Sequence, residues 1–172
     1  KVQMDKAIMT TMLIVISMVM GVLLFNAAYP AIIESNDAMT SMASRADEKL
    51  KSQITIVHAV GELDGDGWWQ DTNGDGDFDV FAWVKNVGDT RIVAVEQTDV
   101  FFGPEGAFNR IPHQSAASGY PYWTWQVENA GEWTPTATLK ITIHYGVPLG
   151  NGRYFLKVIT PNGVDAEYFF SM

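Results

Sequence analysis

Acidic side chains gather between residues 62 and 79, and they are the part of the sequence best suited to binding a cation. Seven Asp and Glu residues fall in this stretch, which contains no Lys or Arg. In the string DTNGDGDFD, oxygen-bearing residues stand at positions 1, 3, 5 and 9 of a calcium-loop pattern, with a glycine at position 6. Calcium prefers hard carboxylate and amide oxygens. The pattern therefore predicts a structural calcium site formed by Asp71, Asn73, Asp75, Asp77 and Asp79.

The match to a calcium loop is incomplete. Position 12 is Ala82, so the bidentate carboxylate of a helix–loop–helix site is missing, and the flanking segments look like strands. Glu62, Asp64 or Asp66 could supply the missing oxygens. The alternative interpretation is a solvated hairpin loop rich in Gly and Asp.

Catalytic signatures are missing from the sequence. The three histidines, His58, His113 and His144, have no H-E-x-x-H pattern, and there is no G-x-S-x-G motif or phosphate-binding glycine loop. The chain contains no Cys, which excludes a cysteine nucleophile, a thiolate zinc site and disulfides. We therefore expect a protein that is not an enzyme. The net charge of -9 argues against a generic nucleic-acid binder, which needs a cationic face.

The segment after residue 52 has the period of β-strands. In Thr138–Tyr145, apolar Leu139, Ile141 and Ile143 alternate with polar residues. Turn signals separate this segment from its neighbours, and no helical pattern intervenes, so we expect an antiparallel β-sandwich (Ig-like) domain over residues 53–172. The other predicted strands are Ile54–Val60, Phe78–Asn86, Arg91–Gln97, Asp99–Phe102, Tyr122–Glu128, Arg153–Thr160 and Asp165–Phe170.

Some large aromatic residues fall on the presumed outer faces of these strands: Phe81, Trp83, Trp123 and Trp125. Two interpretations stay open. Loops can bury the strands on both sides, or the aromatic side chains can form a contact surface for identical neighbours, because large exposed apolar patches usually mark interfaces.

The N-terminal part, residues 1–52, has a different character. Residues 7–33 contain no charge and are apolar around the whole circumference of a helix about 40 Å long, more than a bilayer core requires. The run is too long for a secretory signal peptide, so we expect that any leader was removed upstream of it. Gly21 permits close helix approach, and Pro30 is expected to kink or locally open the helix. An apolar face continues at Met39, Met42, Ala46 and Leu50.

Charges on either side of the apolar run predict its orientation. Lys1 and Lys6 precede the run, whereas Glu34 and Asp37 follow it. By the positive-inside bias, the N-terminus lies in the cytoplasm and residues 34–172 lie outside the cytoplasmic membrane.

The layout of the chain, an α+β arrangement of a long hydrophobic N-terminal α-helix and a β-sandwich, resembles the type IV filament superfamily. The helix AIMTTMLIVISMVMGVLLFNAAYPAII looks like the N-terminal helix of the archaellin and archaellum-accessory branch. The string FAWVKNVGDTRI resembles a strand–turn–strand of that branch, in which V-K-N-x-G recurs. Asp5 stands where type IV pilins carry an acidic fifth residue, whereas archaellins commonly have an uncharged start.

The resemblance implies a homopolymeric extracellular filament, an archaellum or pilus for motility or adhesion. A prepilin-type peptidase would cut before Lys1, and an ATP-driven machine would move the subunit from the membrane into the filament. The helices would form the core, where Asp5 pairs with an α-amino group or with Lys6, and Gly21 and Pro30 shape the helix contacts. The alternatives are a membrane-anchored accessory or stator protein of the archaellum machine and a membrane-anchored surface binding module.

Overall fold

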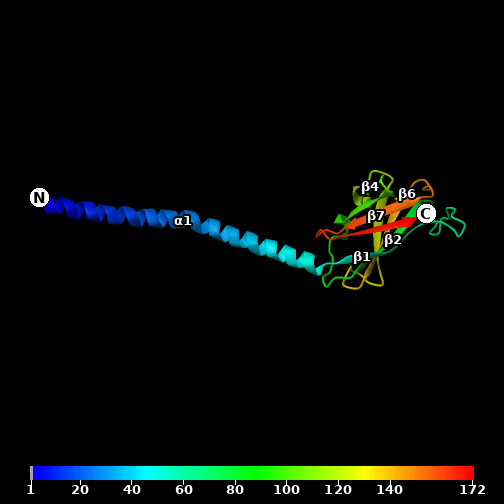
Figure 1. Ribbon diagram of the computed structural model, residues 1–172, viewed down its shortest axis with the longest axis horizontal. Helices are drawn as coiled ribbons and strands as arrows, with labels where there is room; N and C mark the ends of the chain where they lie inside the picture. The colour runs from blue at the N-terminus through cyan, green and yellow to red at the C-terminus, as the bar shows by residue number, and fades with distance from the viewer. Residues whose placement is uncertain (1) are drawn as a thin grey trace. The chain divides into compact units, whose positions relative to one another are not determined.

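The computed structural model describes residues 2–172, and it describes side chains from Met4 onward. Lys1, at the predicted peptidase cleavage point, lies outside the described residues. The chain forms two compact units: the first ends at Arg45 and the second is Ala46–Met172. The first unit is helical, and the second contains the end of the helix and all the strands (Figure 1).

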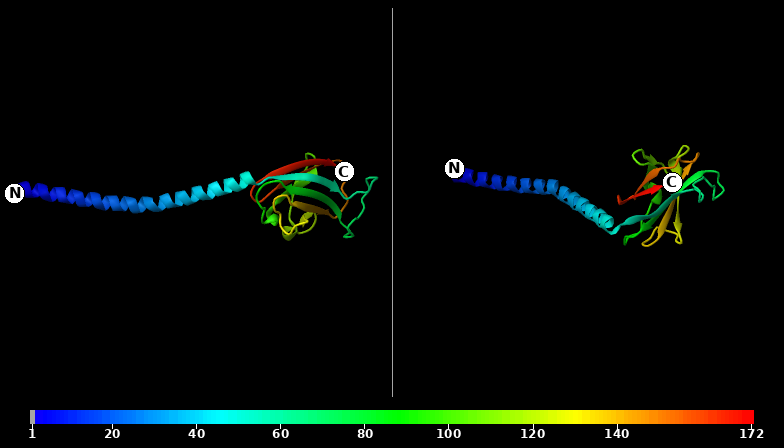
Figure 2. Two further views of the ribbon diagram at one scale, coloured as in Figure 1. Left: turned by 90° about the horizontal axis from the view of Figure 1, so that it is seen from below. Right: turned by 45° about the vertical axis from the view of Figure 1, so that its right-hand side comes forward.

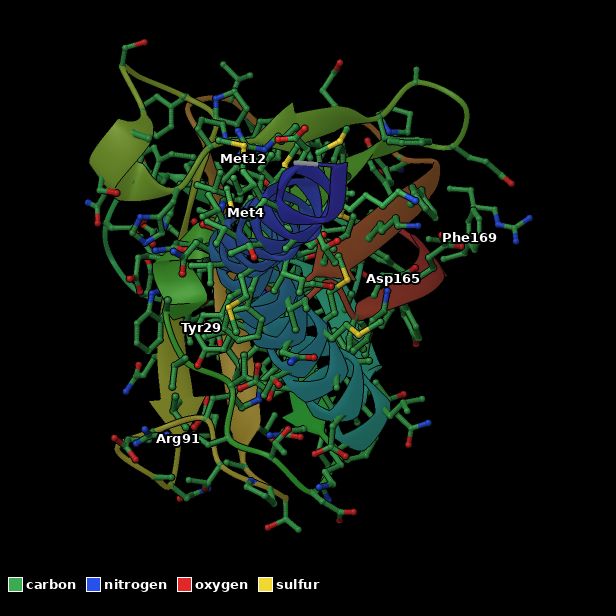
Figure 3. All side chains as sticks on the ribbon, turned by 90° about the vertical axis from the view of Figure 1, so that its left-hand side faces the viewer. Met4, Met12, Tyr29, Arg91, Asp165 and Phe169 are labelled. Atoms are coloured by element: carbon green, nitrogen blue, oxygen red, sulfur yellow. The ribbon has the colours of Figure 1, made fainter. Side chains whose placement is uncertain are left out.

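A single helix, α1, extends over Val2–Lys51. Its apolar side chains project outward around the axis, as at Met4, Met12 and Tyr29 (Figure 3). Hydroxyls within the apolar run return to the backbone; Thr10, for example, donates to the carbonyl of Lys6 at 2.7 Å, which removes their cost in an apolar environment. The helix is long and apolar enough to cross a membrane.

Pro30 lies inside α1 without ending it. The residues on both sides remain helical, so the expected local opening is absent from α1 as described. The helix does bend along its length (Figure 2). A proline ring removes one backbone hydrogen bond and crowds the preceding turn, which is enough to bend a helix without breaking it.

The second unit is a sandwich of two antiparallel four-stranded sheets. One sheet has the order β1-β2-β6-β5 and the other β4-β3-β7-β8. The predicted fold class, an apolar helix followed by an antiparallel sandwich, is confirmed. The strands are β1 (Ile54–Gly61), β2 (Phe78–Asn86), β3 (Asp99–Pro104), β4 (Asn109–Ile111), β5 (Tyr122–Glu128), β6 (Thr138–Tyr145), β7 (Arg153–Ile159) and β8 (Asp165–Ser171).

Alternate residues of the strands fill the space between the two sheets. On β6, Leu139, Ile141 and Ile143 are fully buried, as their alternation predicts. The prediction for Trp123 was wrong: this side chain was placed on an outer face, but it is fully buried on β5. The Trp123 backbone N–H donates to the carbonyl of Pro112, so the segment before β5 pairs along the edge of this strand.

The predicted strand Arg91–Gln97 is also wrong. Only Ile92 forms a β-bridge, with Trp133, and Val95–Gln97 is a short 3-10 helix, η1. Ala94 has a φ of 54°, which an extended strand cannot contain. Ile92 and Val95 are buried from this loop, whereas Val93 between them is exposed.

The loop after β2 holds the end of α1 against the sandwich. Backbone N–H groups of Val87 and Gly88 donate to the carbonyl of Gln53 at 2.9 and 3.0 Å, and that of Asp89 donates to the carbonyl of Lys51 at 2.8 Å. A Cβ added at Gly88 would lie 2.4 Å from the Gln53 nitrogen and 2.5 Å from the Lys51 oxygen. The glycine of the V-K-N-x-G string is therefore required for close backbone contact.

Replacing Gly88 with alanine is expected to lower the free energy of unfolding of the sandwich by about 1–3 kcal/mol, because neighbouring backbone must move. Urea denaturation followed by tryptophan fluorescence measures this, since all six Trp residues follow residue 52. Gly131→Ala is the control, because no atom lies within 4 Å of its added Cβ. Equal losses in the two variants would show that the contact at Gly88 is unimportant.

Candidate metal centre

Strand register brings an aspartate and a histidine together on the outer face of one sheet. Asp79 of β2 and His144 of β6 are direct cross-strand partners. Both are buried, with Asp79 at 0% exposure, although they face away from the core of the sandwich. Such burial arises because the acidic loop between β1 and β2 folds back over this part of the sheet.

Three carboxylates approach one ring nitrogen of His144. Its Nδ1 lies 2.8 Å from Asp79 Oδ1, 3.8 Å from Asp77 Oδ2 and 3.9 Å from Asp75 Oδ2. Potential ligand atoms of Asp75, Asp79 and His144 all lie within 4.8 Å of one another. Although Asp79 Oδ1 and His144 Nδ1 are close, among the described residues neither atom has a hydrogen-bond partner with acceptable geometry.

The opposite side of the His144 ring is held by strand β5. His144 Nε2 lies 2.9 Å from Thr124 Oγ1, and the Tyr122 ring stacks on the imidazole with centroids 4.8 Å apart. When Nε2 carries the proton and donates to Thr124, Nδ1 presents a lone pair to the carboxylates. The strand therefore sets the orientation of the ring.

The predicted calcium ligands do not all turn toward this centre. Asn73 is close to it, donating to Asp75 Oδ2 at 2.9 Å and Asp79 Oδ2 at 2.8 Å. Asp71 instead accepts hydrogen bonds from the backbone N–H groups of Gly74 and Gly76, at 2.6 and 3.1 Å. Its carboxylate therefore shapes the turn and is not among the groups that converge on the histidine.

The acids proposed as sources of further oxygens also have other roles. Glu62, which is buried, accepts from the Thr72 backbone N–H at 2.6 Å and from the Asp79 backbone N–H at 3.3 Å. Asp64 accepts from the backbone N–H groups of Asp66 and Trp68. Glu62 thus ties the loop to the start of β2, and Asp64 caps its own turn.

Negative charge dominates the electrostatics of the centre. Burial has the largest influence on His144 and disfavours its charged form, but contact with Asp79 and the charges of Asp75 and Asp77 outweigh it and raise the pKa of His144. The hydrogen bond that Tyr120 donates to Asp77 raises the pKa of Tyr120 to about 12. Both pKa values are raised because carboxylates of the acidic loop lie beside these two side chains.

Sequence reasoning missed His144 and Tyr120 as members of this centre. His144 stands on the polar face of Thr138–Tyr145, so its outward direction was visible from the alternation. That Asp79 would lie opposite it was not visible, because the pairing of β2 with β6 brings together residues far apart in the chain. Tyr120 comes from a loop for which the sequence carries no such signal.

The predicted assembly residues lie in the other compact unit. Asp5 and Lys6 are exposed in the first turns of α1. A Cβ at Gly21 would have no atom within 4 Å outside the helix's own backbone. Within the described part of the chain these residues and Pro30 are exposed, and their roles in assembly stay a prediction.

Comparisons with known proteins point to one biological system. No family model matches the chain. It is 24% identical over 170 residues to an uncharacterized protein of Archaeoglobus fulgidus, covering 96% of this chain and 98% of that protein. The solved archaellum periplasmic stator protein FlaG from Sulfolobus acidocaldarius is 28% identical, with a TM-score of 0.52 over 69% of this chain and 99% of that chain. A chain from the FlaF and FlaG stator complex of that organism is 32% identical, with a TM-score of 0.51 over 69% of this chain and 88% of that chain.

Proposed function

Since the chain belongs to the family of archaellum periplasmic stator proteins that includes FlaG, we propose that it is a membrane-anchored stator component of an archaellum. In this role the sandwich works outside the cytoplasmic membrane, while α1 keeps it attached. The observation that carries the proposal is the likeness of the fold to FlaG over nearly the whole of that protein's chain.

The same likeness favours the accessory alternative over the expected filament subunit. Both kinds of protein combine an apolar helix with a β-sandwich, so the layout alone does not separate them. The matched proteins are stator proteins, however, and their match covers the larger part of this chain. We therefore assign the archaellum machinery as the setting and set aside the polymer formed through N-terminal helices as the main function.

The helix is suited to permanent anchoring. Its apolar residues are exposed along α1, so lipid or partner helices must cover them. Lys6 precedes the apolar run, and Glu34 and Asp37 follow it, which favours a cytoplasmic N-terminus. A stationary motor part needs such an anchor, because any torque that reaches the sandwich must be opposed by attachment elsewhere.

A second stator protein is the partner that we propose for the sandwich. One of the matched chains comes from a complex that contains both FlaF and FlaG. By analogy, this protein would form a heteromeric complex with a FlaF-like protein of its own cells. A partner of this kind would leave α1 in the membrane while the sandwich engages it.

Cell fractionation tests the proposed function. Cells that produce archaella are sheared, filaments are collected, and washed membranes are extracted with detergent. We expect this protein in the membrane extract, together with a FlaF-like partner after mild crosslinking, and we expect filaments without it. The filament's own main subunit, followed in the same fractions, is the control for complete shearing.

The opposite distribution would overturn the assignment. If the protein were a main component of washed, sheared filaments, the filament-subunit interpretation would be correct. If it remained in membranes of cells that neither produce archaella nor swim, a surface binding module unrelated to motility would be the better description.

A further inference from the structure

We propose that Asp75, Asp79 and His144 bind one divalent transition-metal ion, of which Zn²⁺ is the representative, with Asp77 beside them as a further negative charge. The centre lies between the acidic loop and the outer face of the sheet formed by β2 and β6. This set differs from the predicted calcium loop, because it includes a nitrogen ligand and omits Asp71.

Two buried atoms that lie close together without a hydrogen bond of acceptable geometry are the first argument. Asp79 Oδ1 and His144 Nδ1 are 2.8 Å apart, and neither has another partner in the described part of the chain. Leaving buried polar atoms unpaired costs about 1–3 kcal/mol each. A shared metal ion would satisfy both atoms. Two ligands about 2.1 Å from a tetrahedral ion lie about 3.4 Å apart, so the pair would separate by a few tenths of an ångström.

The spacing of the other carboxylates agrees with a single ion. Ligands of one ion cannot be farther apart than twice the metal–ligand distance, about 4 Å. Asp77 Oδ2 and Asp75 Oδ2 lie 3.8 and 3.9 Å from His144 Nδ1, which is within that limit. The three groups that converge are Asp75 from the loop, Asp79 from β2 and His144 from β6. Their ligand atoms lie within 4.8 Å of one another, so a bound ion would draw them slightly closer together.

Charge balance also calls for a cation. Three carboxylates surround the imidazole, so even a protonated His144 would leave excess negative charge. Asp79 is fully buried; its Oδ2 accepts from Asn73, but its Oδ1 has no hydrogen-bond partner among the described residues. A divalent ion would supply the missing positive charge at the point where these groups converge.

The nitrogen ligand determines the class of ion. Carboxylates alone suit calcium or magnesium, whereas imidazole favours zinc and the neighbouring transition metals. Thr124 lies 2.9 Å from the other ring nitrogen, as expected for the outer partner that orients a metal-binding histidine. Tyr120, which donates to Asp77, holds the neighbouring carboxylate in place.

Metal titration of the full chain in detergent tests the proposal. The protein is stripped with EDTA, dialysed, and titrated calorimetrically with ZnCl₂ and, separately, with CaCl₂. We expect one Zn²⁺ per chain, bound more tightly than Ca²⁺. His144→Gln and Asp79→Asn should each weaken Zn²⁺ binding by about 10-fold or more. Asp66→Asn, a matched charge change at an exposed position of the same loop, should leave Zn²⁺ affinity within about 2-fold. Asp71→Asn is titrated with both ions as the test of the calcium loop.

Each outcome is decisive, including those in which a variant folds poorly. Wild-type protein that takes up no Zn²⁺, or that shows no rise in its thermal unfolding midpoint when Zn²⁺ is added, overturns the proposal without any variant. Equal Zn²⁺ affinity in wild type and His144→Gln also overturns it. Tighter binding of Ca²⁺ that depends on Asp71 would instead establish the calcium loop.

Discussion

Replacing Trp123 with alanine is expected to lower the free energy of unfolding of the sandwich by about 3–5 kcal/mol. Trp123 is fully buried and is among the largest side chains of the core. The His113 ring packs edge-on against it, with centroids 4.7 Å apart. Truncation would remove these contacts and leave a cavity that the two sheets cannot close. Because small domains are stable by only about 5–15 kcal/mol, this is a large share of the total.

Urea denaturation of the full chain in detergent measures the loss, with tryptophan fluorescence reporting the sandwich alone. The control is Trp68→Ala in the acidic loop, where the side chain is 74% exposed. That change should alter the free energy of unfolding by no more than about 0.5 kcal/mol. Similar losses in both variants would mean that Trp123 contributes little through packing.

The sequence predicts a strand well where only one face of that strand is buried, because apolar and polar residues then alternate. In β6 the alternation of Leu139, Ile141 and Ile143 with polar residues defined both the strand and its inner face. The rule failed for Trp123, which was assigned to the outside although it fills the core. It failed again at Ala94, because a single residue with positive φ ends an extended segment without any change in hydrophobic pattern.

The acidic loop was predictable as a place for a cation, but its ligand set was not. Alternating oxygens identify a loop that can surround an ion. Which of those oxygens converge depends on the backbone amides that engage Asp71 and on the cross-strand pairing of Asp79 with His144. Both are consequences of tertiary structure, and neither is encoded in the spacing of the loop itself.

The expected filament function shows a different limit of prediction from the sequence. An uncharged helix followed by a sandwich indicates that a protein is anchored or bundled at its N-terminus. Residues 7–33 show this pattern clearly. It does not report whether the helix stays in lipid or leaves it for a polymer, because both environments are apolar. The likeness to FlaG, and not the helix, is the observation that favours a stator protein over a filament subunit.

The asparagine of the V-K-N-x-G string is the second position at which we expect a substitution to lower stability strongly. Asn86 is fully buried; its amide donates to the carbonyls of Thr90 at 2.8 Å and Trp133 at 3.2 Å, and its oxygen accepts from the Gly88 N–H at 3.0 Å. It therefore joins the loop that holds the end of α1 to the loop before β6.

Asn86→Ala is expected to lower the free energy of unfolding by about 2–4 kcal/mol, because it leaves buried backbone groups unpaired. Asn86→Asp should be at least as harmful, since a carboxylate would face two carbonyl oxygens. The same denaturation experiment measures both, with Asn151→Ala in an exposed turn as the control. If Asn86→Asp were as stable as wild type, the hydrogen bonds of Asn86 would not contribute to stability. Only the close backbone contact at Gly88 would then explain the effect of the V-K-N-x-G string, and water would have to solvate the two carbonyls.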